Sequence, residues 1–106
     1  MRQLLTNKCK EDFEAWYKDL MKESRGLRKK VEWFDSLPLS MQYGIVQDFA
    51  DSVNMPFIVK HESYYKNENN YGYWINGFGW GLTCFLTRHE AREEAIKKFN
   101  EIYNEL

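Results

Sequence analysis

This 106-residue sequence has no long apolar run and no internal repeat, and it has only two cysteines. No apolar run reaches the length of a membrane span, and Lys8 and Lys10 interrupt the region where a signal peptide would lie. The two cysteines, Cys9 and Cys84, are too far apart for a zinc-ligand pair and too few for a disulfide framework. We therefore expect a cytoplasmic protein without membrane contact, metal or other cofactor.

A strong net charge is also lacking. The formal net charge is −1 and the pI is about 6.1, which gives only a weak global case for nucleic-acid binding. Aromatic residues, by contrast, make up 17% of the chain and hydrophobic residues 43%. A chain of this length and composition can bury one core, so residues 1–106 are expected to form a single domain.

The clearest structural signal is a hairpin over residues 71–86. Asn76-Gly77 separates two alternating aromatic runs, which predicts a type I′ turn. The register that follows pairs Ile75 with Phe78, Tyr73 with Trp80, and Tyr71 with Leu82. One face of this hairpin would be apolar and include Cys84. The other would carry Trp74 and Phe85 beside three glycines, which either Trp74 shields or another backbone or flat ligand approaches.

A helix is predicted from Thr87 to the C-terminus. Thr87 and Glu90 have the spacing of a capping box. The apolar stripe that follows comprises Ala91, Ala95, Ile96, Phe99, Ile102, Tyr103 and Leu106. We expect this helix to cover the aromatic face of the sheet.

The first half of the chain predicts helices. One begins at Thr6 or Asn7, and its apolar stripe comprises Phe13, Trp16, Tyr17, Leu20 and Met21. Either this helix resumes after Gly26, or it ends near Ser24 and a short second helix carries Trp33 and Phe34. A further amphipathic helix follows Pro38, spans residues 41–53 and stops at Asn54.

A strand over residues 57–61 and a polar loop over residues 62–70 precede the hairpin. The predicted order is therefore helix, helix, strand, strand, strand, helix. This order is typical of the α+β class, with a three-stranded antiparallel sheet packed against helices.

Catalytic patterns are weak. The segment from His89 to Glu93 lacks the second histidine of a zinc-protease motif, and no Gly-Lys-Ser/Thr follows the glycines of the hairpin. Surface or capping roles explain His61 and His89 equally well. We expect no enzyme activity.

Two sets of residues are candidates for binding. The first is a basic helical stripe of Lys18, Lys22, Arg25 and Lys29, which forms either a solvated face or a contact for phosphates or an acidic protein. The second is a set of aromatic residues beyond the needs of the core: Tyr64, Tyr65, Trp74 and Phe85. These either pack under the long loop or act at an interface, where tyrosine and tryptophan are enriched and can also stack on bases.

The chain resembles two groups of proteins. The order strand, strand, strand, helix after a helix resembles the double-stranded-RNA-binding domain, but residues 88–94 here are mixed and acidic where that family has a lysine cluster. Four segments resemble small phage and prophage proteins of gut bacteria: residues 37–44, 48–52, 87–96 and 100–104. This second resemblance implies a mobile-element origin, where small acidic, aromatic-rich proteins often inhibit host defence systems such as CRISPR nucleases.

The sequence thus favours a small binding protein that occupies a surface of a host macromolecule, most simply a host protein. One alternative is a nucleic-acid-binding accessory protein that uses the basic face of the first helix. Another is a protein that sequesters a small nucleotide in an aromatic pocket. The salt dependence of binding separates the first two, because phosphate contacts weaken steeply with salt.

Overall fold

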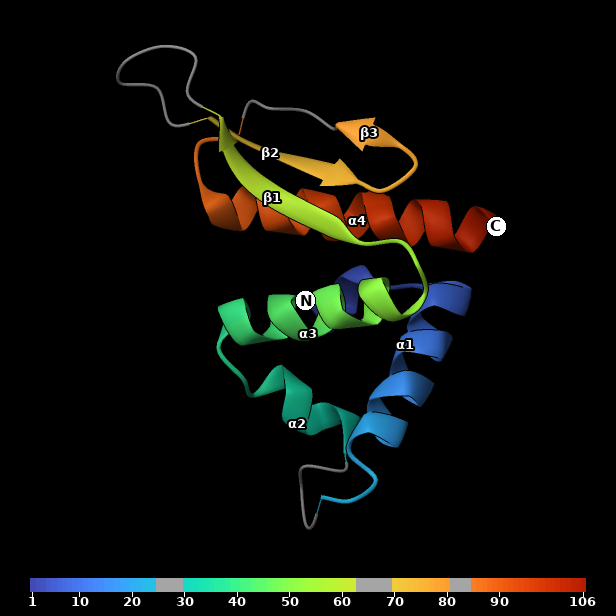
Figure 1. Cartoon of the computed structure of the whole chain (residues 1–106). Coiled ribbons are helices and arrows are strands. Elements are labelled where there is room, and N and C mark those ends of the chain that lie inside the picture. Colours follow the sequence, from blue (N-terminus) through green and yellow to red (C-terminus); the bar gives the residue numbers. More distant parts are fainter. Residues whose placement is uncertain (25–29, 63–69, 81–84) are drawn as a thin grey trace.

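The computed structural model describes residues 1–24, 30–62, 70–80 and 85–106. An antiparallel sheet lies on one side of a group of helices (Figure 1). The elements are η1 (Arg2–Leu4), α1 (Asn7–Leu20), α2 (Val31–Asp35), α3 (Leu39–Ser52), β1 (Phe57–Glu62), β2 (Asn70–Ile75), β3 (Gly79–Trp80) and α4 (Arg88–Glu105). The predicted α+β class is confirmed.

The predicted order of two helices before the sheet is wrong. In the described residues, the short helix α2 lies between α1 and α3, which corresponds to the second of the two alternatives for this region. Pro38 explains why α2 and α3 stay separate, because the residue before a proline is disfavoured in helical conformation. The helical conformation is interrupted at Leu37, and α3 begins directly after Pro38.

The sheet is smaller than predicted. β1 and β2 pair along six residues each, from Phe57 opposite Ile75 to Glu62 opposite Asn70. β3 contains only two residues, so an extended three-stranded sheet does not form within the described residues, and the sheet is mainly a two-stranded one. Leu82, the predicted partner of Tyr71, and Cys84, predicted on the apolar face, lie outside the described residues.

The predicted hairpin register is wrong by one residue. Asn76 does not take the positive φ that a type I′ turn requires, whereas Gly77 and Gly79 have φ of +85° and +77°. The Phe78 N–H donates to the Ile75 carbonyl at 3.0 Å, which closes a turn with glycine at its third position. Gly79 thus opposes Ile75 and Trp80 opposes Trp74, a shift of one residue, whereas Phe85 in place of the predicted Leu82 opposes Tyr71, a shift of three.

Helix α4 lies between the sheet and the layer formed by α1 and α3 (Figure 1). Its first buried residues, Ala91 and Ala95, are small and let the helix approach the sheet closely. The prediction that this helix covers the apolar face of the sheet is confirmed for the described residues. Leu106, predicted as part of the apolar stripe, is 76% exposed because α4 ends at Glu105.

Aromatic rings join the helices to the sheet. Phe13 of α1 packs edge-to-face on Phe34 and Phe49, with ring centroids 5.4 and 5.5 Å apart. Phe99 of α4 contacts Phe49 and Phe57, which connects the helical layer to β1. Leu20 was predicted within the apolar stripe of the first helix but is 54% exposed at the last residue of α1.

Two predicted helix-end signals are present: Asn54 at the end of α3 and Thr87 at the start of α4. Asn54 has φ of +61°, its N–H donates to Asp51, and the Met55 N–H donates to Ala50, which together end α3 in a Schellman motif. At the start of α4, the Thr87 hydroxyl accepts from the Glu90 N–H at 3.1 Å. This bond is the first half of the predicted capping box.

The N-terminus of α1 is capped by side chains of α4. The Cys9 N–H donates to Asn104 Oδ1 at 2.8 Å, and Asn104 Nδ2 donates to the Thr6 carbonyl at 3.0 Å. The Thr6 N–H donates to Asn100 Oδ1 at 2.8 Å. The Thr6 hydroxyl makes no capping bond within its own helix and instead accepts from Asn100 Nδ2. The distant amides thus satisfy donors that a helix start otherwise leaves unpaired.

Candidate functional site

The outer face of the sheet, defined here by Ile58, Lys60 and Trp74, is a candidate binding surface. All the helices in Figure 1 lie on the opposite side of the sheet, so none of the described helices covers this face. Ile58 is 43% exposed and lies directly opposite Trp74 in the register. Trp74 is partly buried, yet in the described structure it does not pack against the hydrophobic core. The placement of Trp74 on the face away from the core agrees with the sequence analysis.

Phe85 does not belong to this surface, so its predicted position is wrong. It pairs with Tyr71 through two backbone hydrogen bonds and stacks on Tyr73 with ring centroids 6.5 Å apart. The shifted register explains the error, because Phe85 is three residues beyond the predicted partner of Tyr71, and an odd shift moves a side chain to the other face. Phe85 therefore packs against the core on the inner face, and the structure separates it from Trp74.

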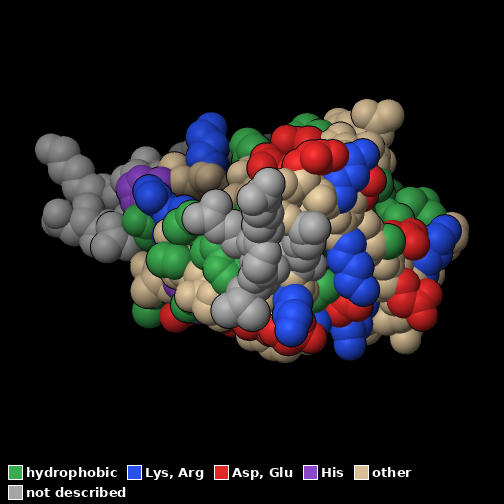
Figure 2. All heavy atoms as spheres, turned by 90° about the horizontal axis from the view of Figure 1, so that it is seen from below, with side chains coloured by type: hydrophobic (Ala, Val, Ile, Leu, Met, Phe, Trp, Pro, Cys, Tyr) green, Lys and Arg blue, Asp and Glu red, His purple; other side chains and the backbone are tan. Residues whose placement is uncertain are grey.

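The predicted basic stripe is only partly described. Lys18 and Lys22 are exposed at the end of α1, whereas Arg25 and Lys29 lie outside the described residues, as do Tyr64 and Tyr65 of the loop. Lys22 lies 3.6 Å from Asp19. Figure 2 shows Lys/Arg and Asp/Glu side chains interspersed on this underside of the molecule. The described part of the stripe is therefore a surface of mixed charge, and it lies away from the sheet (Figure 1).

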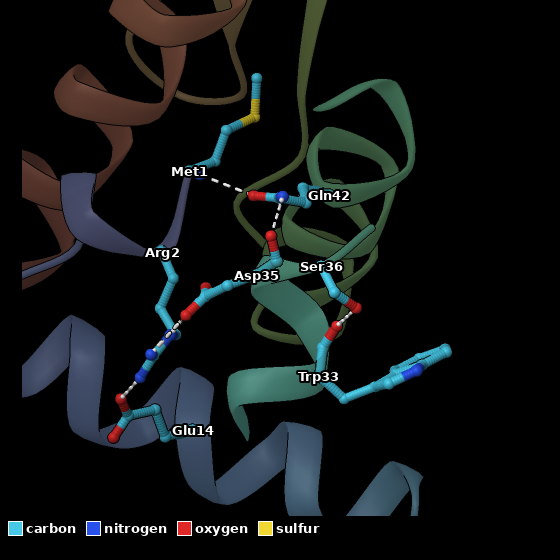
Figure 3. Close-up of polar contacts among 7 residues, drawn as sticks. All are labelled: Met1, Arg2, Glu14, Trp33, Asp35, Ser36 and Gln42. Carbon is cyan, nitrogen blue, oxygen red and sulfur yellow. Dashed lines mark hydrogen bonds and ion pairs between the residues drawn. The ribbon is translucent and has the colours of Figure 1, made fainter. Parts of the chain in front are cut away.

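A cleft of about 550 Å³ lies where η1 meets α1, but two of its charged side chains, Arg2 and Asp35, bind each other. The Arg2 guanidinium forms two hydrogen bonds to Asp35 of α2 and one to Glu14 of α1 (Figure 3). The hydrogen bond from Arg2 holds the pKa of Asp35 below its usual value. This arginine therefore fixes three elements together and is not available to an anion.

Beside this cluster, the buried amide of Gln42 is fully paired (Figure 3). Its Oε1 accepts from the Met1 amino group at 2.7 Å. Its Nε2 donates to the carbonyls of Asp35 and Leu37 at 3.2 and 2.8 Å. The polar groups drawn in Figure 3 thus serve to dock η1 and α2 on α3.

A second, smaller pocket of about 240 Å³ opens beside β1. Seven residues from α3, β1 and α4 line it: Tyr43, Gln47, Ile58, Val59, His61, Arg88 and Arg92. Unlike the first cleft, it contains two buried donors, the Tyr43 hydroxyl and Arg92 Nε, that have no hydrogen-bond acceptor in the described structure. The sequence analysis did not identify this pocket. Its one sequence signal is the spacing of four between Arg88 and Arg92, which puts both arginines on one side of a helix.

The candidate catalytic residues do not form a constellation in the described structure. His89 pairs with Glu93 one turn along α4 at 2.8 Å, and His61 lies at the edge of the smaller pocket. Cys9 is fully buried, and burial raises the pKa of its thiol to about 12, which keeps it unreactive. Cys84 lies outside the described residues. No group of three potential metal-ligating side chains occurs in the described part of the chain.

Comparisons of this chain with protein-family models, with curated proteins and with solved structures found no match. In the described ranges, no helix combines the length and the apolar character that a membrane span requires. The predicted relation to phage proteins remains a prediction.

Proposed function

We propose that the protein is a non-enzymatic binding protein that acts in the cytoplasm by docking the outer face of its sheet on a host protein. The observation that carries this proposal is the exposure of Ile58 beside Trp74 on a face that no described helix covers. Such apolar surface is costly to leave in water and is typical of interaction sites. The resemblance to phage proteins supports a defence nuclease as the host protein.

The charge distribution favours a protein partner over a nucleic acid. Of the three residues that define the outer face, only Lys60 is charged. The basic residues of α1 are interspersed with acidic ones, as the pairing of Lys22 with Asp19 illustrates. A nucleic-acid site needs several cations that are free to neutralise phosphates, and neither described surface offers such a row.

The outer face has the composition of an interface centre. Tryptophan is enriched among residues whose truncation costs 2 kcal/mol or more of binding free energy. We expect Trp74 to act as such an anchor, with Ile58 packed beside it and Lys60 at the rim. Truncation of Trp74 should therefore weaken binding by about thirtyfold or more.

The experiment is capture of partners from host lysate with the tagged chain, before and after nuclease treatment, followed by affinity measurement with the identified protein. Trp74→Ala should abolish capture, whereas Leu39→Ala, which removes a similarly exposed apolar side chain from α3, should not. Retention by Trp74→Ala, or loss of capture after nuclease treatment, would contradict the proposal. Steep weakening with salt would instead support the nucleic-acid alternative.

A further inference from the structure

The pocket beside β1 holds two arginines whose charge is not neutralised by a described carboxylate. Arg92 stacks on the ring of Tyr43, with its guanidinium carbon 4.7 Å from the ring centroid. Arg88 lies over Tyr71 at 5.7 Å. None of the ion pairs among the described residues involves either arginine. The rings hold the guanidinium groups in place without cancelling their charge, which leaves them able to bind an anion.

Two buried polar groups in this pocket lack partners in the described structure. Tyr43 is 6% exposed, and its hydroxyl proton has no acceptor in the described structure, although the Val59 backbone N–H faces the hydroxyl oxygen. Burial raises the pKa of Tyr43 to about 12, against the opposing effects of Arg92 and the Val59 backbone, so the hydroxyl keeps its proton at neutral pH. Arg92 Nε is also buried without a partner. Both groups are hydrogen-bond donors, and native structures rarely leave buried donors unpaired.

The backbone of β1 adds donors to the same place. Gln47 Nε2 donates to the Phe57 carbonyl at 2.8 Å, which shows that the backbone groups of Phe57 point away from β2 and toward α3. Backbone direction alternates along a strand, so the N–H groups of Val59 and His61 point to the same side, where the Val59 N–H faces the Tyr43 hydroxyl oxygen. Helix α4 begins beside this edge, and the positive end of its dipole adds to the positive potential.

We propose that this pocket binds a phosphate group through Arg88, Arg92 and the Tyr43 hydroxyl. The guanidinium groups supply charge and paired donors, the geometry that suits phosphate oxygens best. The volume of about 240 Å³ is below the range of pockets that enclose a whole drug-sized molecule. The pocket therefore fits one phosphate group, either free or at the end of a small molecule. This inference goes beyond the proposed protein docking and does not depend on it.

The test is a titration of the purified chain with inorganic phosphate, and separately with adenosine 5′-monophosphate, with ionic strength held constant by sodium chloride. The readouts are the heat of binding and the thermal unfolding midpoint. We expect saturable binding that raises the midpoint, as for any ligand that binds the folded state. Equal affinity for both probes assigns the site to phosphate itself, and tighter binding of the monophosphate assigns it to a phosphorylated small molecule. No saturable binding of either probe would overturn the proposal.

Three variants and a matched control locate the binding. Arg92→Gln, Arg88→Gln and Tyr43→Phe should each weaken phosphate binding by about tenfold, because each removes a hydrogen bond to a charged group. Lys97→Gln removes an exposed cation from α4 outside the pocket and should leave affinity unchanged. If Lys97→Gln weakened binding as much as the other three, the effect would be general electrostatics and the pocket assignment would fail. Circular dichroism shows which variants remain folded, and any one folded variant of the three suffices.

Discussion

The two halves of α4 differ in whether their polar side chains form hydrogen bonds with the rest of the fold. In the C-terminal half, Asn100, Tyr103 and Asn104 all form hydrogen bonds with residues at the start of α1 or within it. In the N-terminal half, Arg88 and Arg92 stack on tyrosine rings, and donors beside them remain unpaired in the described structure. Both halves lie on the same helix and border the same core.

This difference separates polar groups that hold the fold from polar groups that are left for a ligand. A buried donor that already has an acceptor contributes to stability and costs free energy when it is removed. A buried donor without an acceptor lowers stability, so its removal from the free protein should cost little. The two halves of α4 therefore predict opposite responses to similar substitutions, and the following variants test this from the largest effect to the smallest.

Asn104→Ala should have the largest effect. It removes the acceptor of the Cys9 N–H and a donor to the Thr6 carbonyl, so the start of α1 loses two bonds at once. We expect a loss of about 2–3 kcal/mol in the free energy of unfolding, measured by urea denaturation. Glu105→Ala, at the next and exposed position, is the control and should change stability by less than about 0.5 kcal/mol. An equal loss of stability in Asn104→Ala and Glu105→Ala would mean that the hydrogen bonds of Asn104 contribute nothing specific to stability.

Tyr103→Phe should cost roughly 1–2 kcal/mol, because it removes the bond from the Tyr103 hydroxyl to Asp12 at 2.5 Å. Burial and then this carboxylate raise the pKa of Tyr103 to about 12. A pKa that is raised in the folded state stabilises the protein fully below the unfolded value, near 10, and the contribution is lost as pH rises through about 12. Stability should therefore fall less steeply with alkaline pH in Tyr103→Phe than in the wild type. If stability fell equally with pH in Tyr103→Phe and the wild type, the Tyr103 hydroxyl would not contribute to the pH dependence of stability.

Thr87→Ala tests whether the N-terminal half of α4 also has polar groups that hold the fold. The Thr87 hydroxyl caps the Glu90 N–H, so its loss should cost about 1 kcal/mol in urea denaturation. Thr87→Ser keeps the hydroxyl and should restore most of that stability. An unchanged midpoint in Thr87→Ala would show that the cap does not contribute.

Tyr43→Phe should have the smallest effect on stability, and of the opposite sign. The substitution removes a buried hydroxyl whose proton has no acceptor and keeps the ring on which Arg92 stacks. In phosphate-free buffer we expect the unfolding midpoint to stay the same or rise slightly. The comparison with Tyr103→Phe is direct, since the same atom is removed on each side of the core. A loss of more than about 1 kcal/mol would mean that this hydroxyl is paired in solution.

The regular elements of this fold could be predicted because their signals are local. The apolar spacing of three and four located α1, α3 and α4, and Thr87 and Asn54 marked two helix ends. The hairpin register could not be predicted from Asn76-Gly77 alone. The dipeptide fits more than one turn, and the positive φ of Gly79 selects the one that shifts the register by a residue.

The candidate sites were less predictable because they depend on which elements meet. Trp74 was placed on the correct face because it lies before the turn, and Phe85 on the wrong face because it lies after it. The phosphate pocket joins α3, β1 and α4, and nothing local to Tyr43 indicates that it will meet Arg92, 49 positions later in the sequence. Such a site becomes visible only when the packing of the three elements is known.

The capping of α1 by Asn100 and Asn104 has a consequence for how the chain folds during synthesis. The residues joined by these bonds are 94 to 98 positions apart, so the bonds form only after α4 has been made. Until then the N–H groups of Thr6 and Cys9 lack these side-chain acceptors, whereas Phe13 of α1 can already pack on Phe34 and Phe49. Contacts of such long sequence separation slow folding, because a large loop must close before they form. Helix α4 thus completes the start of α1, and truncation of the chain before Asn100 would remove all of these bonds.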